Sequence, residues 1–264
     1  MMSTLVCFHA HPDDEAISTG GLMALAAKQG HRVVLVCATR GEQGEPQEGV
    51  LLQGEELWER RVVELAEAAR LLGADEPRLL GYEDSGMMGE PTNDNPNCFW
   101  QAEHDEATQR MAAILREVEA DVLTIYDENG GYGHPDHIRV HTVGKAAAEL
   151  IGLEHVYEAT MNRDHIEELM AAAVEAGEDV GEDIDPNSFG TASADITFGI
   201  DVSSAVDLKK AAIVAHRSQV GPDSFFLAMP DEAFAQAFGL EWFNVPGSTS
   251  TGGPKMVSLL PGLD

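Results

Sequence analysis

The sequence predicts an α/β fold: one domain with a mainly parallel sheet flanked by helices, plus a less regular C-terminal portion. Two observations carry this prediction. Short apolar runs alternate with amphipathic stretches through the first 150 residues, and polar loops follow four of those runs. Strand–helix alternation favours parallel strands joined by helical crossovers. We therefore expect a Rossmann-like core in residues 1–150 that carries the site, and a portion in residues 151–264 that completes the substrate pocket.

The first half alternates four expected strands with four expected helices. The run 32–38 (RVVLVCA) is β-branched and bounded by polar residues, as in a buried strand. Apolar residues in 55–72 recur at spacings of three and four, which indicates one face of a helix. Gly30 is the expected end of the first helix. The strands are Leu5–His9, Arg32–Ala38, Arg78–Tyr82 and Asp121–Tyr126, and the helices are Ala16–Gln29, Glu55–Leu72, Glu103–Glu119 and Pro135–Leu150.

The second half has weaker patterns. Apolar spacing predicts helices over Arg163–Ala176 and Ala205–His216, and a strand over Ala194–Val202. Gly177–Asp185 reads as an acidic loop, and the density of Gly, Pro, Ser and Thr predicts an irregular tail over Val245–Pro261. We expect the C-terminal half to be less regular than the first half and to complete the substrate pocket.

Charge and composition narrow the classes of partner. Lys and Arg number 16 and Asp and Glu 46, giving 16 − 46 = −30, which repels nucleic acids and anionic lipid surfaces. The N-terminus lacks the positive region of a signal peptide, and no apolar stretch approaches the length of a membrane span. The three cysteines suggest no disulfide framework. We expect a cytoplasmic protein that acts on a small molecule, with its oligomeric state left open.

Two polar clusters have the composition of a metal site. His11-Pro12-Asp13-Asp14-Glu15 follows the first expected strand, and His134-Pro135-Asp136-His137 follows the fourth. Both lie at carboxyl ends of strands, where ligands bind in open α/β sheets. A catalytic zinc site uses three protein ligands, commonly imidazole nitrogens and a carboxylate oxygen, and leaves a position for water. Two histidines and one carboxylate from these clusters meet that description.

Each cluster holds more polar residues than a metal requires. Asp13 lies beside the His-x-x-Asp pair and is suited to act as a general base toward a water molecule that the metal activates. His134 precedes His137 by three residues and is placed to support an oxyanion or to protonate a leaving amine. A single histidine at a strand end is usually a surface or capping residue, and a lone aspartate there is usually a helix cap. The joint occurrence of both clusters favours a catalytic site.

Four segments carry a resemblance to a known family: HAHPDDE at His9–Glu15, RVVELAEAARLLG at Arg61–Gly73, DSGM at Asp84–Met87, and YDENGGYGHPDH at Tyr126–His137. The sequence resembles the LmbE-like, or PIG-L, family of zinc-dependent N-deacetylases, including its mycothiol-pathway members, a deacetylase and a conjugate amidase. The similarity covers roughly the N-terminal 150 residues. HRSQ at His216–Gln219 also looks familiar for the family.

The resemblance implies a role for each matched residue. His11, Asp14 and His137 match the zinc ligands, and Asp13 matches the general base. His134 matches the residue that stabilises the tetrahedral intermediate, with Asp136 orienting it. Three further matches are Tyr132, which helps to polarise the amide carbonyl, and Arg61 and Asp84, which contact the sugar conjugate.

The resemblance and the residues together predict a hydrolase that removes the acetyl group from an N-acetylglucosamine-type conjugate. The metal is expected to be Zn²⁺, although two histidines and a carboxylate also suit Fe²⁺, Co²⁺ or Ni²⁺. One alternative is an amidase acting on a larger amide, such as a mycothiol-type thiol conjugate or a glycosylated natural product. A second is a metal-binding module without turnover. A nucleotide-binding module lacks support, because neither glycine-rich phosphate motif is present.

Several other residues are weaker candidates. Arg40, at a strand end, is suited to an anionic substrate group but equally to solvent, and the tryptophans suit either sugar stacking or packing. His216 is expected either to line the site or to cap a helix end. We expect the two histidines that flank the motifs to be supporting or structural residues. The residues in question are Trp58, Trp100, Trp242, His9 and His141.

Overall fold

The computed structural model describes residues 2–175, 189–248, 250 and 252–263. An eight-stranded sheet runs through this part of the chain, in the order β3-β2-β1-β4-β5-β7-β6-β8. The α/β prediction with a mainly parallel sheet is confirmed, because five of the seven described strand pairs are parallel. The strands are β1 Thr4–His9, β2 Arg32–Cys37, β3 Arg78–Leu79, β4 Val122–Tyr126, β5 His155–Thr160, β6 Phe198–Asp201, β7 Leu240–Asn244 and β8 Lys255–Val257.

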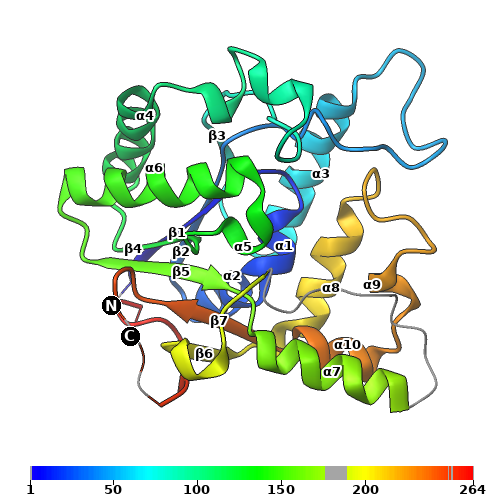
Figure 1. The fold of residues 1–264 in the computed structure, drawn as a ribbon, viewed down its shortest axis with the longest axis vertical. Helices are drawn as coiled ribbons and strands as arrows, with labels where there is room; N and C mark the ends of the chain where they lie inside the picture. The colour runs from blue at the N-terminus through cyan, green and yellow to red at the C-terminus, as the bar shows by residue number, and fades with distance from the viewer. Residues whose placement is uncertain (1, 176–188, 249, 251, 264) are drawn as a thin grey trace.

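Helices cover both faces of the sheet (Figure 1). Successive residues of β1 face opposite layers: Cys7 packs with the cluster that includes α2, α3 and α8, and Phe8 packs with the cluster that includes α4 and α6. Burial on both faces explains why β1 and β2 are almost continuously apolar. The helices are α1 Asp14–Ser18, α2 Gly20–Lys28, α3 Leu57–Leu71, α4 His104–Glu117, α5 Gly130–Gly133, α6 Pro135–Ile151, α7 Arg163–Glu175, α8 Val206–Ala215, α9 Phe225–Ala228 and α10 Asp231–Phe238.

The strand order places a crevice between β1 and β4. The chain runs outward from β1 through β2 to β3, and then returns to the other side of β1 as β4. Connections leave the sheet in opposite directions at this point, which opens the crevice where ligands bind in doubly wound folds. The two predicted metal clusters follow β1 and β4, so the topology brings them to this crevice.

Two expected elements of the first half differ from the structure. The helix expected over Ala16–Gln29 is two helices, α1 and α2, because Thr19 leaves helical geometry at φ −134° and its hydroxyl lies 2.8 Å from Nε2 of His9. The strand expected over Arg78–Tyr82 is only two residues long. The backbone N–H groups of Leu80 and Tyr82 still donate to the carbonyls of Cys37 and Ala38, but Gly81, at φ 88°, interrupts the extended conformation between them.

The C-terminal portion departs from the strand–helix alternation of the first half, but it adds further strands to the same sheet. Residues after 151 supply β5, β6, β7 and β8, which is half of the described sheet. β7 pairs antiparallel with both β5 and β6, and these long-range pairings have no local sequence signature. Part of the expected irregular tail forms β8, and the strand expected over Ala194–Val202 shortens to Phe198–Asp201 after a turn of 3₁₀ helix. The expected acidic loop Gly177–Asp185 lies outside the described residues.

Among the described residues, no helix has the length and apolar character needed to cross a bilayer. The longest one, α6, carries a buried face that packs on the sheet. Its Gly144 allows a close approach, since a Cβ there would lie 2.5 Å from Cγ2 of Ile125. The structure thereby fixes α6, and the cluster at its N-terminus, tightly against β4.

Candidate active site

The two groups of potential metal ligands predicted from the sequence, His11–Glu15 and His134–His137, lie close together at the carboxyl end of the sheet. His11 and Asp14 lie between β1 and the first turn of α1, and His137 lies in the first turn of α6. Oδ2 of Asp14 is 3.3 Å from Nδ1 of His11 and 3.4 Å from Nε2 of His137. Asp14 therefore lies between two imidazole nitrogens whose residues are 126 positions apart (137 − 11) in the chain.

The protonation pattern of His11 suits a ligand at Nδ1. Its Nε2 lies 3.2 Å from Oδ2 of Asp136, and that carboxylate also accepts hydrogen bonds from the backbone N–H, at 2.9 Å, and the hydroxyl of Ser85. A carboxylate that receives these donors acts as an acceptor toward His11, so the imidazole donates from Nε2. The charge of Asp84 and the hydrogen bonds with Asp136 and Asp14 outweigh burial and hold the pKa of His11 well above its ordinary value, so a metal at Nδ1 would replace the proton that faces Asp14. Metal-binding histidines characteristically donate their other ring N–H to a carboxylate in this way.

His137 supplies a second indication that the site fits a cation. Its Nε2 is buried and makes no hydrogen bond in the described structure, although Asp14 is within 3.4 Å. Buried polar atoms are normally satisfied, so an orphaned ring nitrogen beside a carboxylate calls for a partner. The opposing charges of His137 and His11 outweigh burial and hold the pKa of Asp14 well below its ordinary value. These residues match the donor set of a zinc site.

His11 also belongs to two other groups of closely spaced potential ligands, one with His134 and His137 and one with Asp84 and Asp136. The carboxylates of both sets accept backbone N–H donors: Asp84 from Gln43 and Gly86, Asp136 from Ser85, and Asp14 from His11. The predicted set, unlike the second group, includes the orphaned Nε2 of His137, and it joins that nitrogen to a carboxylate. We therefore favour His11, Asp14 and His137 as the ligands.

Asp13 is held in a strained conformation next to the ligands. Its φ of 119° is in a region that side chains rarely adopt, and such strain costs on the order of 1–3 kcal/mol. Arg61 of α3 anchors the segment, donating to Oδ2 of Asp13 at 3.0 Å and to the carbonyl of Pro12 at 2.5 Å. Burial raises the pKa of Asp13 to about 6, although the Arg61 charge opposes the rise. A carboxylate with a pKa in this range suits a general base near neutral pH.

His134 is placed as a neutral donor. Its Nδ1 accepts a hydrogen bond from the backbone N–H of Asp136 at 3.1 Å and so caps α6. The ring hydrogen is then on Nε2. Burial, together with the neighbouring rings of His11 and His137, lowers the pKa of His134 to about 4. Between its two expected roles, this geometry favours donation to an oxyanion over protonation of a leaving amine.

Asp136 orients His134 in a way that the sequence did not suggest. The contact runs through the backbone N–H of Asp136, whereas its carboxylate lies against His11 and Ser85. Ser85 is itself placed by the backbone N–H of Trp100, which donates to its hydroxyl at 2.9 Å. Ser85 belongs to the DSGM segment, but no spacing rule pointed to its contact with Asp136.

Tyr132 lies at the mouth of the site. It is 49% exposed, and its ring centre is 5.0 Å from that of His137 and 6.2 Å from that of His134. The short α5 that carries it is kinked, with Gly131 at φ 75° and Tyr132 at φ −130°. A phenol beside the ligands on an exposed, glycine-rich turn is accessible to a bound substrate.

The two residues expected to contact substrate are both buried. Arg61 is 4% exposed and is engaged by Asp13, Pro12 and the carbonyl of Gly41, so in this structure it shapes the Asp13 segment. Asp84 is also 4% exposed, and its Oδ1 lies 3.4 Å from Nε2 of His11. Their contact with a sugar remains a prediction.

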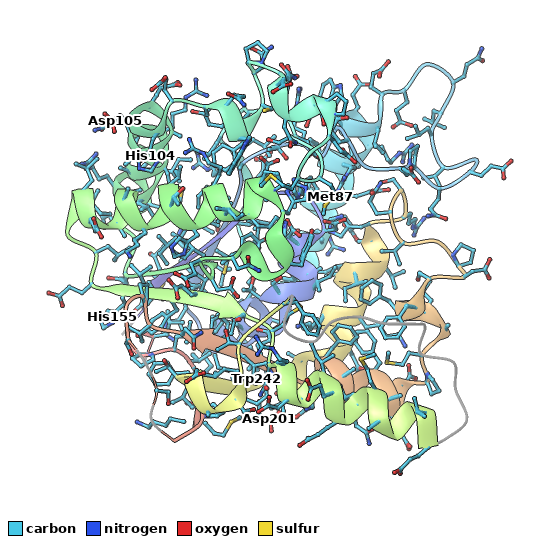
Figure 2. The ribbon with its side chains drawn as sticks, in the orientation of Figure 1. Met87, His104, Asp105, His155, Asp201 and Trp242 are labelled. Atoms are coloured by element: carbon cyan, nitrogen blue, oxygen red, sulfur yellow. The ribbon has the colours of Figure 1, made fainter. Side chains whose placement is uncertain are left out.

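Among the weaker candidates, Arg40 and Trp58 lie beside the Asp84 loop, whereas Trp242 packs against β6 and α7. The guanidinium of Arg40 stacks 4.2 Å above the ring of Trp58 and binds Glu42, next to the Asp84 loop. Trp242 instead packs over Gly199 of β6 and beside His165 of α7, in the lower half of the molecule in Figure 2.

The histidines flanking the motifs support neighbouring residues. His9 is buried and bonds Tyr126 through Nδ1 at 2.9 Å, and the Tyr126 ring stacks on His137 at 4.2 Å between centres. His141 lies 3.1 Å from the carbonyl of Tyr126. Stacking of Tyr126 on His137 was not expected from the sequence, because an aromatic residue at a strand end has no single characteristic role.

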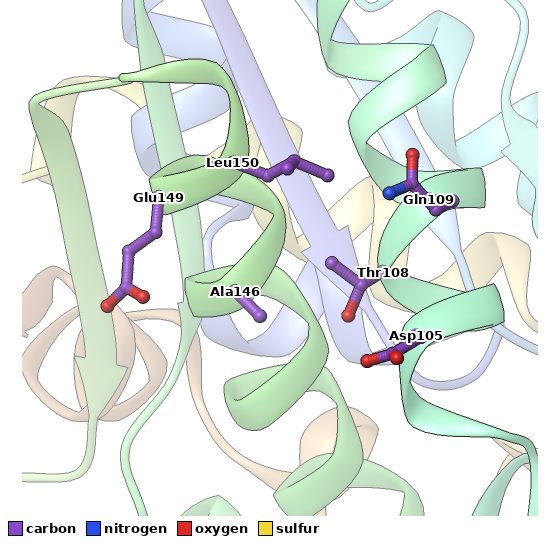
Figure 3. Close-up of a pocket in the computed structure, with 6 residues that line it drawn as sticks. All are labelled: Asp105, Thr108, Gln109, Ala146, Glu149 and Leu150. Carbon is purple, nitrogen blue, oxygen red and sulfur yellow. The ribbon is translucent and has the colours of Figure 1, made fainter.

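A surface hollow lies away from the group of potential ligands. It lies between α4 and α6 and is lined by one short set of side chains from each helix (Figure 3). Two carboxylates line it but no histidine or cysteine does, and none of its lining residues belongs to the site described above. The lining residues are Asp105, Thr108, Gln109, Ala146, Glu149 and Leu150.

Comparison with known proteins finds a family match over the part of the chain that contains the predicted ligands. The family model described as GlcNAc-PI de-N-acetylase, PIG-L, matches residues 6–148, which include both metal clusters. A 1D-myo-inositol 2-acetamido-2-deoxy-alpha-D-glucopyranoside deacetylase from Acidothermus cellulolyticus is 41% identical, over 92% of this chain and 88% of its own. The enzyme of the same name from Thermomonospora curvata is 38% identical over 97% and 96%.

A solved structure shares the fold at lower identity. The N,N'-diacetylchitobiose deacetylase from Pyrococcus horikoshii is 22% identical, with a TM-score of 0.58 over 93% of this chain and 84% of its own. At that identity the likeness shows the fold alone. The family match spans more than half of the chain, and the relatives cover nearly all of it. The chain therefore belongs to the PIG-L family of de-N-acetylases and is an enzyme of that deacetylase class.

Proposed function

We propose that this protein is a metal-dependent deacetylase of an N-acetylglucosamine–inositol conjugate. The observation that carries the proposal is the convergence of His11, Asp14 and His137 beside Asp13, with an orphaned nitrogen on His137. Relatives at 34–41% identity are named for deacetylation of that conjugate. Two histidines and a carboxylate suit Zn²⁺, and they also suit Fe²⁺, Co²⁺ and Ni²⁺.

Each residue of the site has a defined task in amide hydrolysis. A divalent metal held by His11, Asp14 and His137 would supply Lewis acidity, which lowers the pKa of water to roughly 7 and polarises a carbonyl. Asp13 takes the proton from the attacking water, and its pKa near 6 leaves it ionised at neutral pH.

The developing oxyanion and the amine have separate partners. Nε2–H of His134 donates to the oxyanion, and the exposed hydroxyl of Tyr132 approaches the same carbonyl from the mouth of the site. Asp13, carrying the proton taken from water, is the residue suited to deliver it to the departing amine, because His134 holds its Nδ1 lone pair in the α6 cap. The reaction gives acetate and a free amino sugar.

The rival functions have less support. The relatives from Acidothermus cellulolyticus, Catenulispora acidiphila and Thermomonospora curvata are named as deacetylases of an inositol glycoside, not as amidases of a larger thiol conjugate. A metal-binding module without turnover has no need of a buried base or of a capped, neutral histidine. Asp13 and His134 supply both.

A substrate panel tests the proposal. Purified protein is stripped of metal, reloaded with Zn²⁺ or Fe²⁺, and assayed for free amine and acetate with N-acetylglucosamine, its inositol conjugate and a larger thiol conjugate. We expect the inositol conjugate to be hydrolysed fastest and the stripped protein to be inactive. Hydrolysis of the thiol conjugate in preference to the other two would identify an amidase, and full activity of the stripped protein would reject a metal mechanism.

A further inference from the structure

A buried pair joins the C-terminal half of the chain to the metal-binding loop. Nε2 of His216 lies 2.6 Å from Oε1 of Glu15, and both side chains are completely buried. The two residues are 201 positions apart, and Glu15 directly follows the ligand Asp14. Nδ1 of His216 has no hydrogen-bond partner in the described structure, so the imidazole makes its side-chain hydrogen bond to Glu15 through Nε2.

The other oxygen of Glu15 acts on Asp13. Oε2 accepts the backbone N–H of Asp13 at 3.0 Å. Asp13 has the strained φ of 119°, and a strained residue persists only where its surroundings fix it from several sides. Arg61 donates hydrogen bonds to the Asp13 carboxylate and to the preceding carbonyl of Pro12, and Glu15 accepts one from the backbone N–H of Asp13. Both contacts together set the direction of the Asp13 carboxylate.

The segment that carries His216 is itself anchored to α3. Glu64 accepts the backbone N–H of Ser218 at 2.9 Å and its hydroxyl at 2.6 Å. Glu64 lies three residues after Arg61, on the same buried face of the helix. One helix therefore holds Asp13 directly through Arg61 and holds His216 through the Ser218 turn.

We propose that His216 is a positioning residue for catalysis: it fixes Glu15, and Glu15 fixes the backbone of Asp13. This rests on the proposed role of Asp13 as the base. His216 contacts neither substrate nor ligand in this arrangement, and its effect reaches the reaction through Asp13. The C-terminal half thereby stabilises the loop that carries Asp13 and Asp14, in addition to extending the sheet.

A second buried pair provides a matched control. Lys209 lies 2.6 Å from Oε1 of Glu241, and both are almost fully buried, as His216 and Glu15 are. Glu241 also accepts the backbone N–H groups of Gly21 and Leu22, at the start of α2. This pair also ties the C-terminal half to the N-terminal half but makes no contact with Asp13. Removal of the Lys209–Glu241 pair therefore measures how much stability is lost when a buried contact between the two halves is broken without disturbing Asp13.

The test compares His216→Ala, His216→Gln and Glu241→Gln as metal-loaded enzymes. We expect His216→Ala to lose about 10–100-fold in kcat, the range typical of residues that orient metal-site groups, with KM and metal content unchanged. His216→Gln keeps an amide donor within reach of Glu15, so most of the activity should return. Glu241→Gln should lower the melting temperature and leave kcat of the folded enzyme unchanged.

A second background separates positioning from general damage. In Asp13→Ala enzyme, the additional His216→Ala change should have almost no effect on the residual rate, because two residues that act through one group are not additive. If His216→Ala does not fold, His216→Asn, whose amide is one methylene too short to reach Glu15, takes its place beside His216→Gln.

Three results would overturn the proposal: wild-type kcat in His216→Ala, equal losses in the Ala and Gln variants, or an undiminished effect of His216→Ala in Asp13→Ala enzyme. Failure of the proposed base would look different, because Asp13→Ala alone would then retain wild-type turnover.

Discussion

Oδ2 of Asp136 lies 3.2 Å from Nε2 of His11, although the two residues are 125 positions apart. This contact joins the cluster after β1 to the cluster after β4 and determines which nitrogen of His11 faces Asp14. Ser85 completes it from a third loop. The proposed metal site thus draws on three strand ends that the topology brings to one edge of the sheet.

Asp136→Asn should therefore weaken metal binding. The amide removes the charge that orients His11, and loss of such a partner typically lowers metal affinity by about 10–100-fold. Competition with a chromophoric chelator measures the affinity. Glu241→Gln serves as the control, because it disturbs a buried carboxylate away from the ligands. Equal affinities for Asp136→Asn and the wild type would show that the contact does not tune the site.

Gly144→Ala should destabilise the fold. A Cβ at this position would lie 2.5 Å from Cγ2 of Ile125, so α6 must shift from β4. Overpacking of this kind costs about 1–3 kcal/mol in the free energy of unfolding, measured by urea denaturation. Glu149→Ala, on the exposed face of the same helix, should change it by less than about 0.5 kcal/mol. Equal stabilities of the two variants would contradict the close packing.

The sequence predicted the half of the fold that repeats local patterns. β1, β2 and β4 are buried on both faces and read as apolar runs, and their polar ends located His11, Asp13, Asp14 and His137. β7 escaped prediction because its antiparallel partners are remote in sequence. The break between α1 and α2 escaped it because Thr19 bonds His9, a tertiary contact.

The supporting residues of the site were harder to predict than its ligands. Ligand types and spacings are restricted by the chemistry of the metal. The contact between Glu15 and His216 depends instead on where α8 ends in space, and the contact of Asp136 with Ser85 depends on a loop with no regular pattern. Such contacts become visible only when the chain is folded.

Glu158 should make the stability of the fold depend on pH. Burial, reinforced by the charge of Asp127, raises its pKa to about 7 from an ordinary value of 4.5. Between those pH values the folded protein binds more protons than the unfolded chain, so the free energy of unfolding falls as pH rises through this window. Glu158→Gln should flatten that part of the profile, and the exposed Glu154→Gln should not. Identical profiles for the two variants would contradict the shift.

Salt should stabilise the protein. With a net charge of −30, the compact state suffers strong self-repulsion. The screening length falls from about 10 Å at 0.1 M salt to about 3 Å at 1 M, so the repulsion weakens over this range. We expect the melting temperature to rise steadily with KCl concentration in calorimetry. A melting temperature that is flat or falls with added salt would show that the surface charge does not limit stability.

Measurement of metal content and turnover together in Asp13→Ala tests the role of Asp13 as the general base. Asp13 is held by Arg61 and Glu15 rather than by the metal in this account. The variant should therefore retain a full complement of metal by elemental analysis. It should lose about 10²–10⁴-fold in kcat, the usual contribution of a general base. An emptied metal site with His11, Asp14 and His137 intact, or wild-type turnover, would contradict the account.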